Sequence, residues 1–174
     1  LRRQRQMCIR DRFRTLSQHV LSPAKIVTEM NNSISDNNES NMFVTLIVGI
    51  LDLETGILKL CNAGHNPPIL IYPDGQVSSL EFKTQIFVGV VEDFKYSDEE
   101  VVLEKESKLF LYTDGVTEAE NINKELYGEE KLLEMLSDNA SSDVRTTVNV
   151  VVDSIASHVK EAEASDDLTI LLIQ

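Results

Sequence analysis

The sequence predicts an α+β protein with a mainly antiparallel sheet. Short apolar runs separated by turn residues fill most of the chain, two runs with helical spacing follow late in it, and no internal repeat or low-complexity tract is found. Strands that cluster before helices are typical of α+β domains. With 174 residues, the chain is long enough for one domain with a sizeable core.

The N-terminal segment, residues 1–12, differs in composition from everything after it. It is rich in arginine, and the stretch from Met7 to Arg12 looks like translated sequencing-adapter or vector sequence fused to a truncated gene. A genuine basic arm is the alternative. We therefore leave residues 1–12 out of the fold prediction as a non-native segment and assign residues 13–174 to the domain. Sequencing the genomic locus upstream of Phe13 would test this assignment.

The first predicted helix begins at Ser22 and Pro23, because serine is a good N-cap and proline suits the first helical position. Asn31 and Asn32 are expected on its polar side, and residues 35–41 should form a loop. Apolar side chains recur along the helix at helical spacing, at Ile26, Val27, Met30 and Ile34.

Antiparallel hairpins are predicted next. Apolar runs are bounded by glycine-containing turns at residues 53–56 and 73–75, which is typical of a meander. Residues 63–68 form a sharp break, and residues 84–96 are less regular, with 87–91 either a short strand or an extended segment. Strands are expected at residues 42–52, 57–62, 69–72, 77–80, 99–103, 109–112 and 168–173.

Two helices are predicted before the last strand. The first follows Gly128 and carries three leucines along one face. Ser141 or Ser142 is expected to cap the second, longer helix. That helix places apolar residues at near-helical spacing, at Val144, Val148, Val151, Ile155 and Val159.

Composition limits the classes of function. The net charge of −13 should repel nucleic acid and anionic membranes. No apolar run is long enough to span a bilayer and no signal peptide is recognised, so we expect no membrane association for this segment. Cys61 lies in a predicted strand and is interpreted as a small buried residue. With two cysteines and no zinc-binding pattern, a reducing cytoplasm is the expected location.

Carboxylates stand at the ends of two predicted strands. Residues 109–112 are apolar without a gap, as in a strand buried on both faces, and Asp114-Gly115 ends it because glycine accepts backbone angles that a strand cannot continue through. Asp166 and Asp167 precede the last strand. If the two strands are antiparallel neighbours, Asp114 and Asp166 lie at the same end of the sheet. Such carboxylates favour Mg²⁺ or Mn²⁺ over zinc, although on spacing alone an ordinary turn and a solvated acid are the better interpretation.

Three stretches in fixed order change that interpretation. Residues 43–68 end in Asn-Ala-Gly-His-Asn-Pro-Pro, residues 111–119 contain Thr-Asp-Gly, and residues 166–169 read Asp-Asp-Leu-Thr. Together they resemble the bacterial SpoIIE/RsbU-type branch of the PPM metal-dependent serine/threonine phosphatases, and the likeness runs from about Phe13 to the C-terminus. The resemblance implies an αββα sandwich with mainly antiparallel sheets. It also implies two Mn²⁺ or Mg²⁺ ions that activate a water to hydrolyse phosphoserine or phosphothreonine.

The resemblance also implies roles for single residues. Asp114 corresponds to the metal-binding Asp of the Thr-Asp-Gly motif, and Asp166 to the Asp that opens the last motif. Asp167 is expected to contact the metal ligands without binding the metal itself. Thr113 and Gly115 would shape the loop, glycine by letting backbone approach the metal closely.

His65 has two interpretations. It could donate a proton in catalysis, or it could fix the turn between Gly64 and the two prolines. The resemblance covers this motif without giving it a clear catalytic task, so we expect the structural role.

Two motifs of the family are not found. These are a Gly-Asp strand and an Asp-Xaa-Xaa-Gly-His-Gly motif, which belong to the N-terminal half of the domain. We therefore interpret residues 13–174 as the C-terminal part of a phosphatase domain whose N-terminal part is missing. An incomplete metal site, little or no activity, and an exposed sheet edge or apolar face are expected.

The family also implies a setting for the reaction. Bacterial signalling such as sigma-factor regulation is the expected context, with a phosphorylated anti-sigma-factor antagonist as a typical substrate, and a homodimer remains open. The alternative is a non-catalytic PPM-like module that binds a signalling regulator, and a third reading is an acidic domain that binds divalent ions without hydrolysis.

Overall fold

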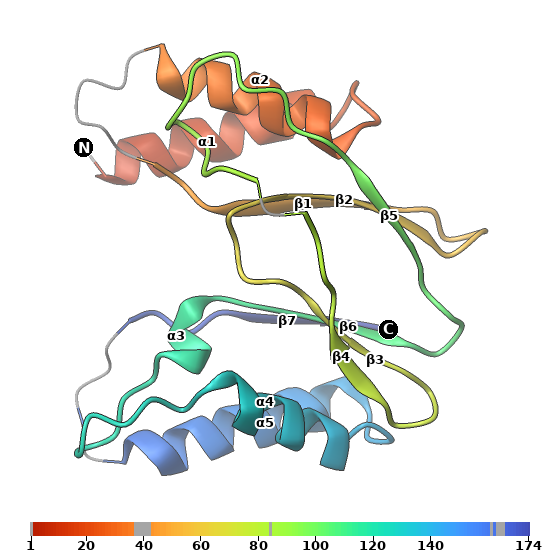
Figure 1. Ribbon diagram of the computed structural model, residues 1–174, viewed down its shortest axis with the longest axis vertical. Coiled ribbons are helices and arrows are strands. Elements are labelled where there is room, and N and C mark those ends of the chain that lie inside the picture. Colours follow the sequence, from red (N-terminus) through yellow and green to blue (C-terminus); the bar gives the residue numbers. More distant parts are fainter. Residues whose placement is uncertain (1, 37–42, 84, 161, 163–165) are drawn as a thin grey trace. The chain divides into compact units, whose positions relative to one another are not determined.

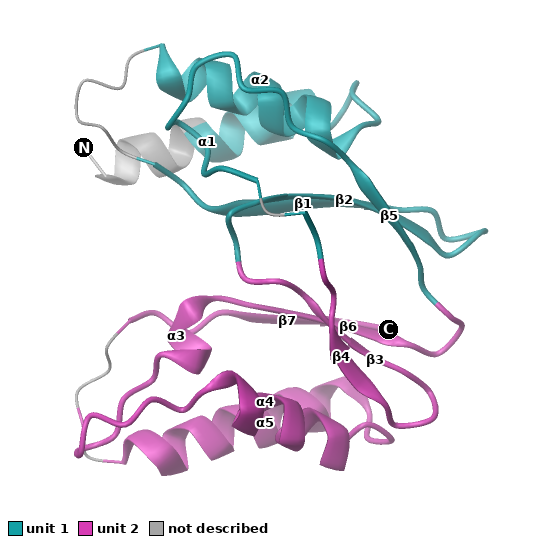
Figure 2. Ribbon diagram, in the orientation of Figure 1, with its two compact units in different colours: residues 1–65, 82–103 teal, residues 66–81, 104–174 magenta. Residues whose placement is uncertain are grey.

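The computed structural model describes residues 2–36, 43–83, 85–160, 162 and 166–174. The chain forms two units, and two segments of the chain contribute to each (Figure 2). Unit 1 comprises residues 1–65 and 82–103, and unit 2 comprises residues 66–81 and 104–174. Among the described helices, none is both long enough and apolar enough to cross a bilayer.

Unit 1 contains a three-stranded antiparallel sheet (Figure 1). Its elements are α1 (Arg2–Leu16), α2 (Pro23–Ser35), β1 (Leu46–Leu51), β2 (Ile57–Ala63) and β5 (Glu99–Val102). The strand order is β1-β2-β5, and β1 and β2 form the predicted hairpin. Val48 and Cys61 of this hairpin join Val27 and Met30 of α2 in one buried cluster. Cys61 is buried as predicted, and burial raises the pKa of its thiol to about 12.

Helix α1 includes most of the segment that we left out of the fold prediction. Ile9 and Leu16 lie against the buried cluster of unit 1. They stand two turns apart on one face of the helix, and this apolar face was missed because the surrounding arginines dominate the composition. The adapter origin of residues 1–12 stays a prediction.

Helix α2 begins where the sequence predicts. Ser22 is its N-cap, and the Ser22 hydroxyl accepts a hydrogen bond from the N–H of Lys25 at 3.3 Å. The same hydroxyl donates to Asp98 Oδ2 at 2.7 Å. Asp98 Oδ1 accepts the N–H of Ala24, so two side chains satisfy the free N–H groups of the first turn.

Asn31 contradicts the prediction that it lies on the polar side of the helix. Its side chain is fully buried. Asn31 Nδ2 donates to the carbonyl of Val91 at 2.9 Å, and its Oδ1 accepts the N–H of Gly89 at 2.8 Å. The buried amide of Asn31 therefore binds the irregular segment before β5 to α2, a contact that helical periodicity alone does not reveal.

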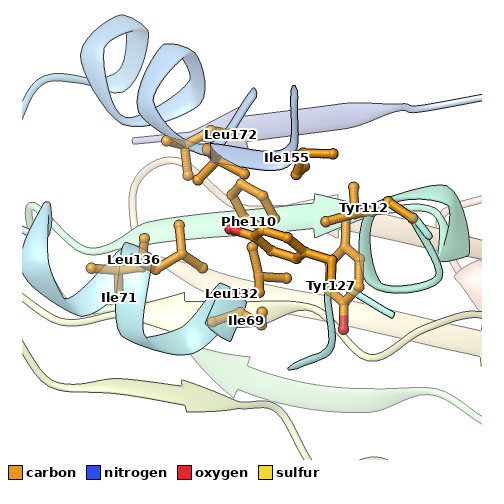
Figure 3. Packing of buried hydrophobic residues seen from close by; sticks show 12 residues of the cluster. Ile69, Ile71, Phe110, Tyr112, Tyr127, Leu132, Leu136, Ile155 and Leu172 are labelled. Carbon is orange, nitrogen blue, oxygen red and sulfur yellow. The ribbon is translucent and has the colours of Figure 1, made fainter. Parts of the chain in front are cut away.

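Unit 2 contains a four-stranded antiparallel sheet with helices on one face (Figure 1). Its elements are β3 (Ile69–Ile71), β4 (Val77–Ser79), β6 (Lys108–Tyr112), α3 (Asp114–Thr117), α4 (Glu129–Asp138), α5 (Val144–Val159) and β7 (Ile170–Ile173). The strand order is β4-β3-β6-β7. Leu132 and Leu136 of α4 and Ile155 of α5 pack on Phe110 and Leu172 of the sheet (Figure 3).

The strands do not form the single meander that we expected. β1 pairs with β2 and β3 pairs with β4, but β2 and β3 belong to different sheets. The chain breaks between them because Gly64 has φ +72° and Pro67 and Pro68 have no N–H to donate. Later strands complete each sheet, β5 beside β2 and β6 beside β3.

The ends of two strands differ from the prediction. The first strand begins at Leu46, and Val44 makes only an isolated bridge with Val88. That bridge is the sole pairing of the described segment 87–91. The last strand begins at Ile170 rather than at residue 168. Residues 37–42, which include most of the predicted loop, lie outside the described residues.

The cap of α5 also differs from the prediction. Asp143, rather than Ser141 or Ser142, is the N-cap, and its Oδ1 accepts the N–H of Thr146 at 3.0 Å. Serine and aspartate cap helices about equally well, so residue type could not separate three consecutive candidates.

Strand β7 forms one edge of the sheet of unit 2. Leu172 points into the core, whereas Leu171 and Ile173 are 54% and 39% exposed. This strand thus combines a sheet edge with exposed apolar side chains, and the prediction that a missing N-terminal part leaves them exposed stays a prediction.

Candidate functional site

The candidate site is built on β6, a central strand of unit 2. β6 pairs with β3 on one side and with β7 on the other. Phe110 and Tyr112 are 0% and 4% exposed and belong to the core (Figure 3). Burial raises the pKa of Tyr112 to about 12, so its phenol stays neutral near pH 7. A buried strand paired on both edges gives the residues that follow it a fixed starting point.

Asp114 follows this strand and opens the short helix α3. Val116 is fully buried and anchors α3 to the core of unit 2, while the Asp114 side chain is exposed. Asp114 Oδ1 accepts the N–H of Gly115 at 3.0 Å. The chain thus presents a carboxylate to solvent from a helix that cannot easily shift.

Asp166 and Asp167 lie just before β7, and both side chains are exposed. Asp166 Oδ1 accepts the N–H of Asp167 at 2.7 Å. β6 and β7 are antiparallel neighbours, with Tyr112 opposite Ile170. The predicted arrangement is therefore confirmed, because the segment before β7 meets the segment after β6 at one end of the sheet.

Thr113 joins the two acidic segments. The N–H of Thr113 donates to the carbonyl of Thr169 at 3.1 Å, which continues the β6–β7 ladder by one step. The Thr113 hydroxyl accepts the N–H of Thr169 at 3.2 Å and donates to the carbonyl of Asp167 at 3.3 Å. Three hydrogen bonds from one residue therefore hold the segments side by side.

Gly115 allows the same two segments to touch. A Cβ atom built at Gly115 would lie 2.5 Å from the carbonyl oxygen of Asp167, closer than real Cβ contacts come. We expected glycine here for its backbone angles and for a close approach of backbone to the metal, but Gly115 is helical and its φ is not positive. Close approach, and not a special backbone angle, explains why glycine is needed here.

The donors at this end of the sheet are oxygen atoms of carboxylates, which suit Mg²⁺ and Mn²⁺. Across the residues that the structure describes, no three Asp, Glu, His or Cys side chains gather closely enough to hold a metal ion. Mg²⁺ is commonly held by one or two carboxylates and keeps several waters. Asp114 and Asp166 therefore fit one part of a hydrated Mg²⁺ or Mn²⁺ site, and they do not fit a closed zinc site.

His65 belongs to unit 1, whereas Thr113, Asp114 and the residues before β7 belong to unit 2. The side chain of Asn62 closes the turn at this point, accepting the N–H of His65 at 2.8 Å and donating to its carbonyl at 2.9 Å. The His65 Nδ1 lies 3.4 Å from the hydroxyl of Thr45. These contacts support the structural role that we expected for His65, which stays a prediction.

Thr169 is the residue that the sequence prediction missed. We quoted it as part of the last motif but gave it no role, although both of its backbone polar groups bond Thr113. The antiparallel pairing that we expected between the strands next to Asp114 and Asp166 could have revealed the role of Thr169. Once that pairing is drawn, Thr113 and Thr169 fall opposite each other.

A family model described as Stage II sporulation protein E (SpoIIE) matches residues 6–174. The chain belongs to the SpoIIE family. The resemblance that we inferred from three motifs, to a SpoIIE/RsbU-type PPM phosphatase domain, is confirmed.

Two curated relatives are longer than this chain. Protein IcfG of Synechocystis is 25% identical over 175 residues, which cover 95% of this chain and 27% of IcfG. Phosphoserine phosphatase RsbU of Bacillus subtilis is 23% identical over 161 residues, which cover 92% of this chain and 47% of RsbU. The chain therefore spans less than half the length of either relative.

Solved structures confirm the fold. The SiaA-PP2C domain of Pseudomonas aeruginosa superimposes with a TM-score of 0.84 at 21% identity, covering 97% of this chain and 68% of that one. The phosphatase domain of the cell fate determinant SpoIIE from Bacillus subtilis, presoaked with Mn, gives a TM-score of 0.64 at 13% identity and covers 95% of this chain and 72% of that one. The predicted α+β class with mainly antiparallel sheets is thus confirmed as the PP2C fold.

Proposed function

We propose that this chain is part of a metal-dependent protein phosphatase that hydrolyses phosphoserine or phosphothreonine in bacterial signalling. The observation that carries the proposal is the pairing of the Asp114 and Asp166 segments by Thr113 at one end of the unit 2 sheet. Family membership supplies the reaction class, because RsbU, which resembles this chain, is named a phosphoserine phosphatase.

In this proposal Asp114 and Asp166 hold Mg²⁺ or Mn²⁺, with two ions in the complete site. Bound ions of this kind polarise a phosphoryl group and acidify water. The protein itself contributes position, since β6, α3 and the Thr113 bonds fix where the two carboxylates stand. Asp167 contributes its backbone, because its carbonyl meets Thr113 and its N–H meets Asp166.

The proposed substrate is a phosphorylated protein, and an anti-sigma-factor antagonist is the proposed example. The RsbU resemblance supports this substrate class. A net charge of −13 supports a protein rather than a nucleic acid as the partner, because the acidic surface repels phosphate backbones. A cytoplasmic location remains part of the proposal.

The test uses the protein expressed from its complete gene, with Mn²⁺ and a phosphoserine peptide, and measures the release of phosphate. We expect Asp114→Asn to lower turnover by more than about 100-fold, because loss of outer-shell partners alone costs about 10- to 100-fold in metal sites. The matched control is Asp138→Asn, which changes another exposed aspartate of unit 2 at the end of α4.

Turnover that survives both a chelator and Asp114→Asn would contradict the proposal. Metal binding without phosphate release would instead favour the non-catalytic module. Residues 13–174 alone are expected to release little phosphate, because the described residues contain no cluster of three metal-binding side chains. Mn²⁺-dependent turnover by residues 13–174, abolished by Asp114→Asn, would overturn that expectation.

A further inference from the structure

We propose that the hydroxyl of Thr113 is a positioning group that sets the divalent-cation affinity of this site. It does so by holding the Asp166–Asp167 segment against the start of α3. The inference rests on the proposed function, since it assumes that Asp114 and Asp166 bind the cation.

The geometry singles out the hydroxyl from the rest of the residue. The regular β6–β7 ladder ends with Tyr112 opposite Ile170. One further backbone bond joins Thr113 to Thr169, and beyond it no backbone pairing between the two strands is found among the described residues. Here side-chain hydrogen bonds follow the backbone bonds: the Thr113 hydroxyl accepts the N–H of Thr169 and donates to the carbonyl of Asp167. One oxygen atom therefore bonds two of the three residues that connect Asp166 to β7, Asp167 and Thr169.

The electrostatics explain why such a bridge is needed. Three exposed aspartates, Asp114, Asp166 and Asp167, belong to the two joined segments. Like charges on two neighbouring segments oppose their approach when no cation lies between them. Without the Thr113 hydroxyl, the segment before β7 would be held less closely to the start of α3. Cation binding would then have to offset the free-energy cost of ordering that segment.

At Gly115 the start of α3 and the segment before β7 are in close contact. The missing side chain of Gly115 lets the carbonyl of Asp167 approach to a distance that no Cβ would allow. Gly115 thus removes a steric obstacle, whereas Thr113 supplies the attraction. A site held in shape before the ion arrives binds more tightly than one that must be ordered by the ion.

A purely structural role for Thr113 makes a different prediction. Thr169 is exposed, so water can replace the Thr113 hydroxyl as a partner for its N–H. Loss of the hydroxyl should therefore change thermal stability little and change cation affinity strongly. A strong loss of cation affinity with little loss of thermal stability would distinguish a positioning role of Thr113 from a purely structural one.

The experiment titrates Mn²⁺ alone into the protein expressed from its complete gene, with no substrate, and follows free Mn²⁺ by electron paramagnetic resonance. We expect Thr113→Val, which keeps the shape and removes the hydroxyl, to raise the Kd by about 10- to 100-fold. Thr113→Ser keeps the hydroxyl and should restore most of the affinity. Thr28→Val in unit 1 is the matched control, because it removes a hydroxyl that accepts the backbone N–H of Tyr96 at 3.4 Å.

Each outcome has a separate meaning. If Asp114→Asn weakens Mn²⁺ binding and Thr113→Val does not, the inference is overturned and the proposed function stands. Equal losses for the serine and valine variants would overturn it as well, because the hydroxyl would then not be responsible. If the unaltered protein does not bind Mn²⁺, or if Asp114→Asn leaves binding unchanged, the proposed function fails and the inference fails with it.

Discussion

Gly115 is the residue at which one methyl group should decide whether the site forms. Alanine is favoured over glycine in a helix by about 1 kcal/mol, so the change would be expected to stabilise α3. The added Cβ would, however, lie 2.5 Å from the Asp167 carbonyl, which is backbone and cannot rotate away. We therefore expect Gly115→Ala to destabilise the protein by about 1–3 kcal/mol and to weaken Mn²⁺ binding.

Thermal melting and Mn²⁺ titration of Gly115→Ala check this prediction. Gly49→Ala is the control, because its φ is also ordinary and the nearest atoms to its Cβ would be side-chain carbons of Leu58, at 3.3 Å, and of Leu60, at 3.6 Å. Unchanged Mn²⁺ affinity in Gly115→Ala would show that the close approach has no bearing on the site.

The connection between α4 and α5 depends on a buried lysine of β6. Lys108 is 4% exposed, and its ammonium donates to the carbonyls of Ala140, at 2.7 Å, and Ser142. Lys108→Met keeps the length of the side chain but leaves both carbonyls without this donor. We expect the free energy of unfolding to fall by about 1–3 kcal/mol, as measured by urea denaturation.

Lys59→Met provides the comparison for Lys108→Met. Lys59 forms a surface ion pair with Glu100 at 3.0 Å, with side chains 47% and 58% exposed. Such exposed ion pairs contribute little to stability, so Lys59→Met should hardly change the free energy of unfolding. If the two variants behave alike, the Lys108 contacts do not stabilise the α4–α5 connection.

Helix α5 should make stability depend on pH through its cap. The Thr146 hydroxyl, and then its N–H, hold the pKa of Asp143 below its ordinary value of 3.8. Because the folded pKa is the lower one, the stabilisation is complete above the ordinary value and is lost as the pH falls through the folded pKa.

Urea denaturation of the protein and of Asp143→Asn between pH 6 and pH 2 checks this dependence. Asparagine caps about as well as aspartate but does not titrate, so the protein should lose stability relative to the variant only below about pH 4. A constant difference across the whole range would rule out Asp143 as the source. Asp52, whose pKa is also lowered, is unchanged in both proteins and cancels in the comparison.

At the scale of the whole molecule, the open edge of the unit 2 sheet favours self-association. Among the described residues no strand pairs with the outer edge of β7, and Leu171 and Ile173 of this strand are 54% and 39% exposed. An exposed apolar edge strand is a template for pairing with another chain, and lysine on such a strand prevents it. We expect Leu171→Lys to reduce association of residues 1–174 in light scattering.

The control for Leu171→Lys is Leu53→Lys, which changes a leucine that is 88% exposed in the β1–β2 turn. An isolated exposed leucine is ordinary for a protein surface, so this change should have little effect. A greater reduction from Leu53→Lys than from Leu171→Lys would contradict the assignment to the β7 edge.

Local chemistry explains which predictions succeeded. The apolar run before Tyr112 and the start of α2 at Ser22 each follow from neighbours in sequence, and both were confirmed. The capping residue Asp143 and the buried Asn31 were missed. In the first case several adjacent residues were suitable, and in the second a distant segment supplied the partners, so no local pattern distinguished them.

The sequence by itself determined the fold class and the strand that ends at Tyr112, because periodicity and residue type are properties of neighbouring positions. Only the tertiary structure decided that the β1–β2 and β3–β4 hairpins belong to different sheets. It also decided that Thr113 bonds the segment before β7. It also decided why residue 115 is glycine. These features depend on contacts between residues far apart in the chain, and their distances are set by the packing of each unit.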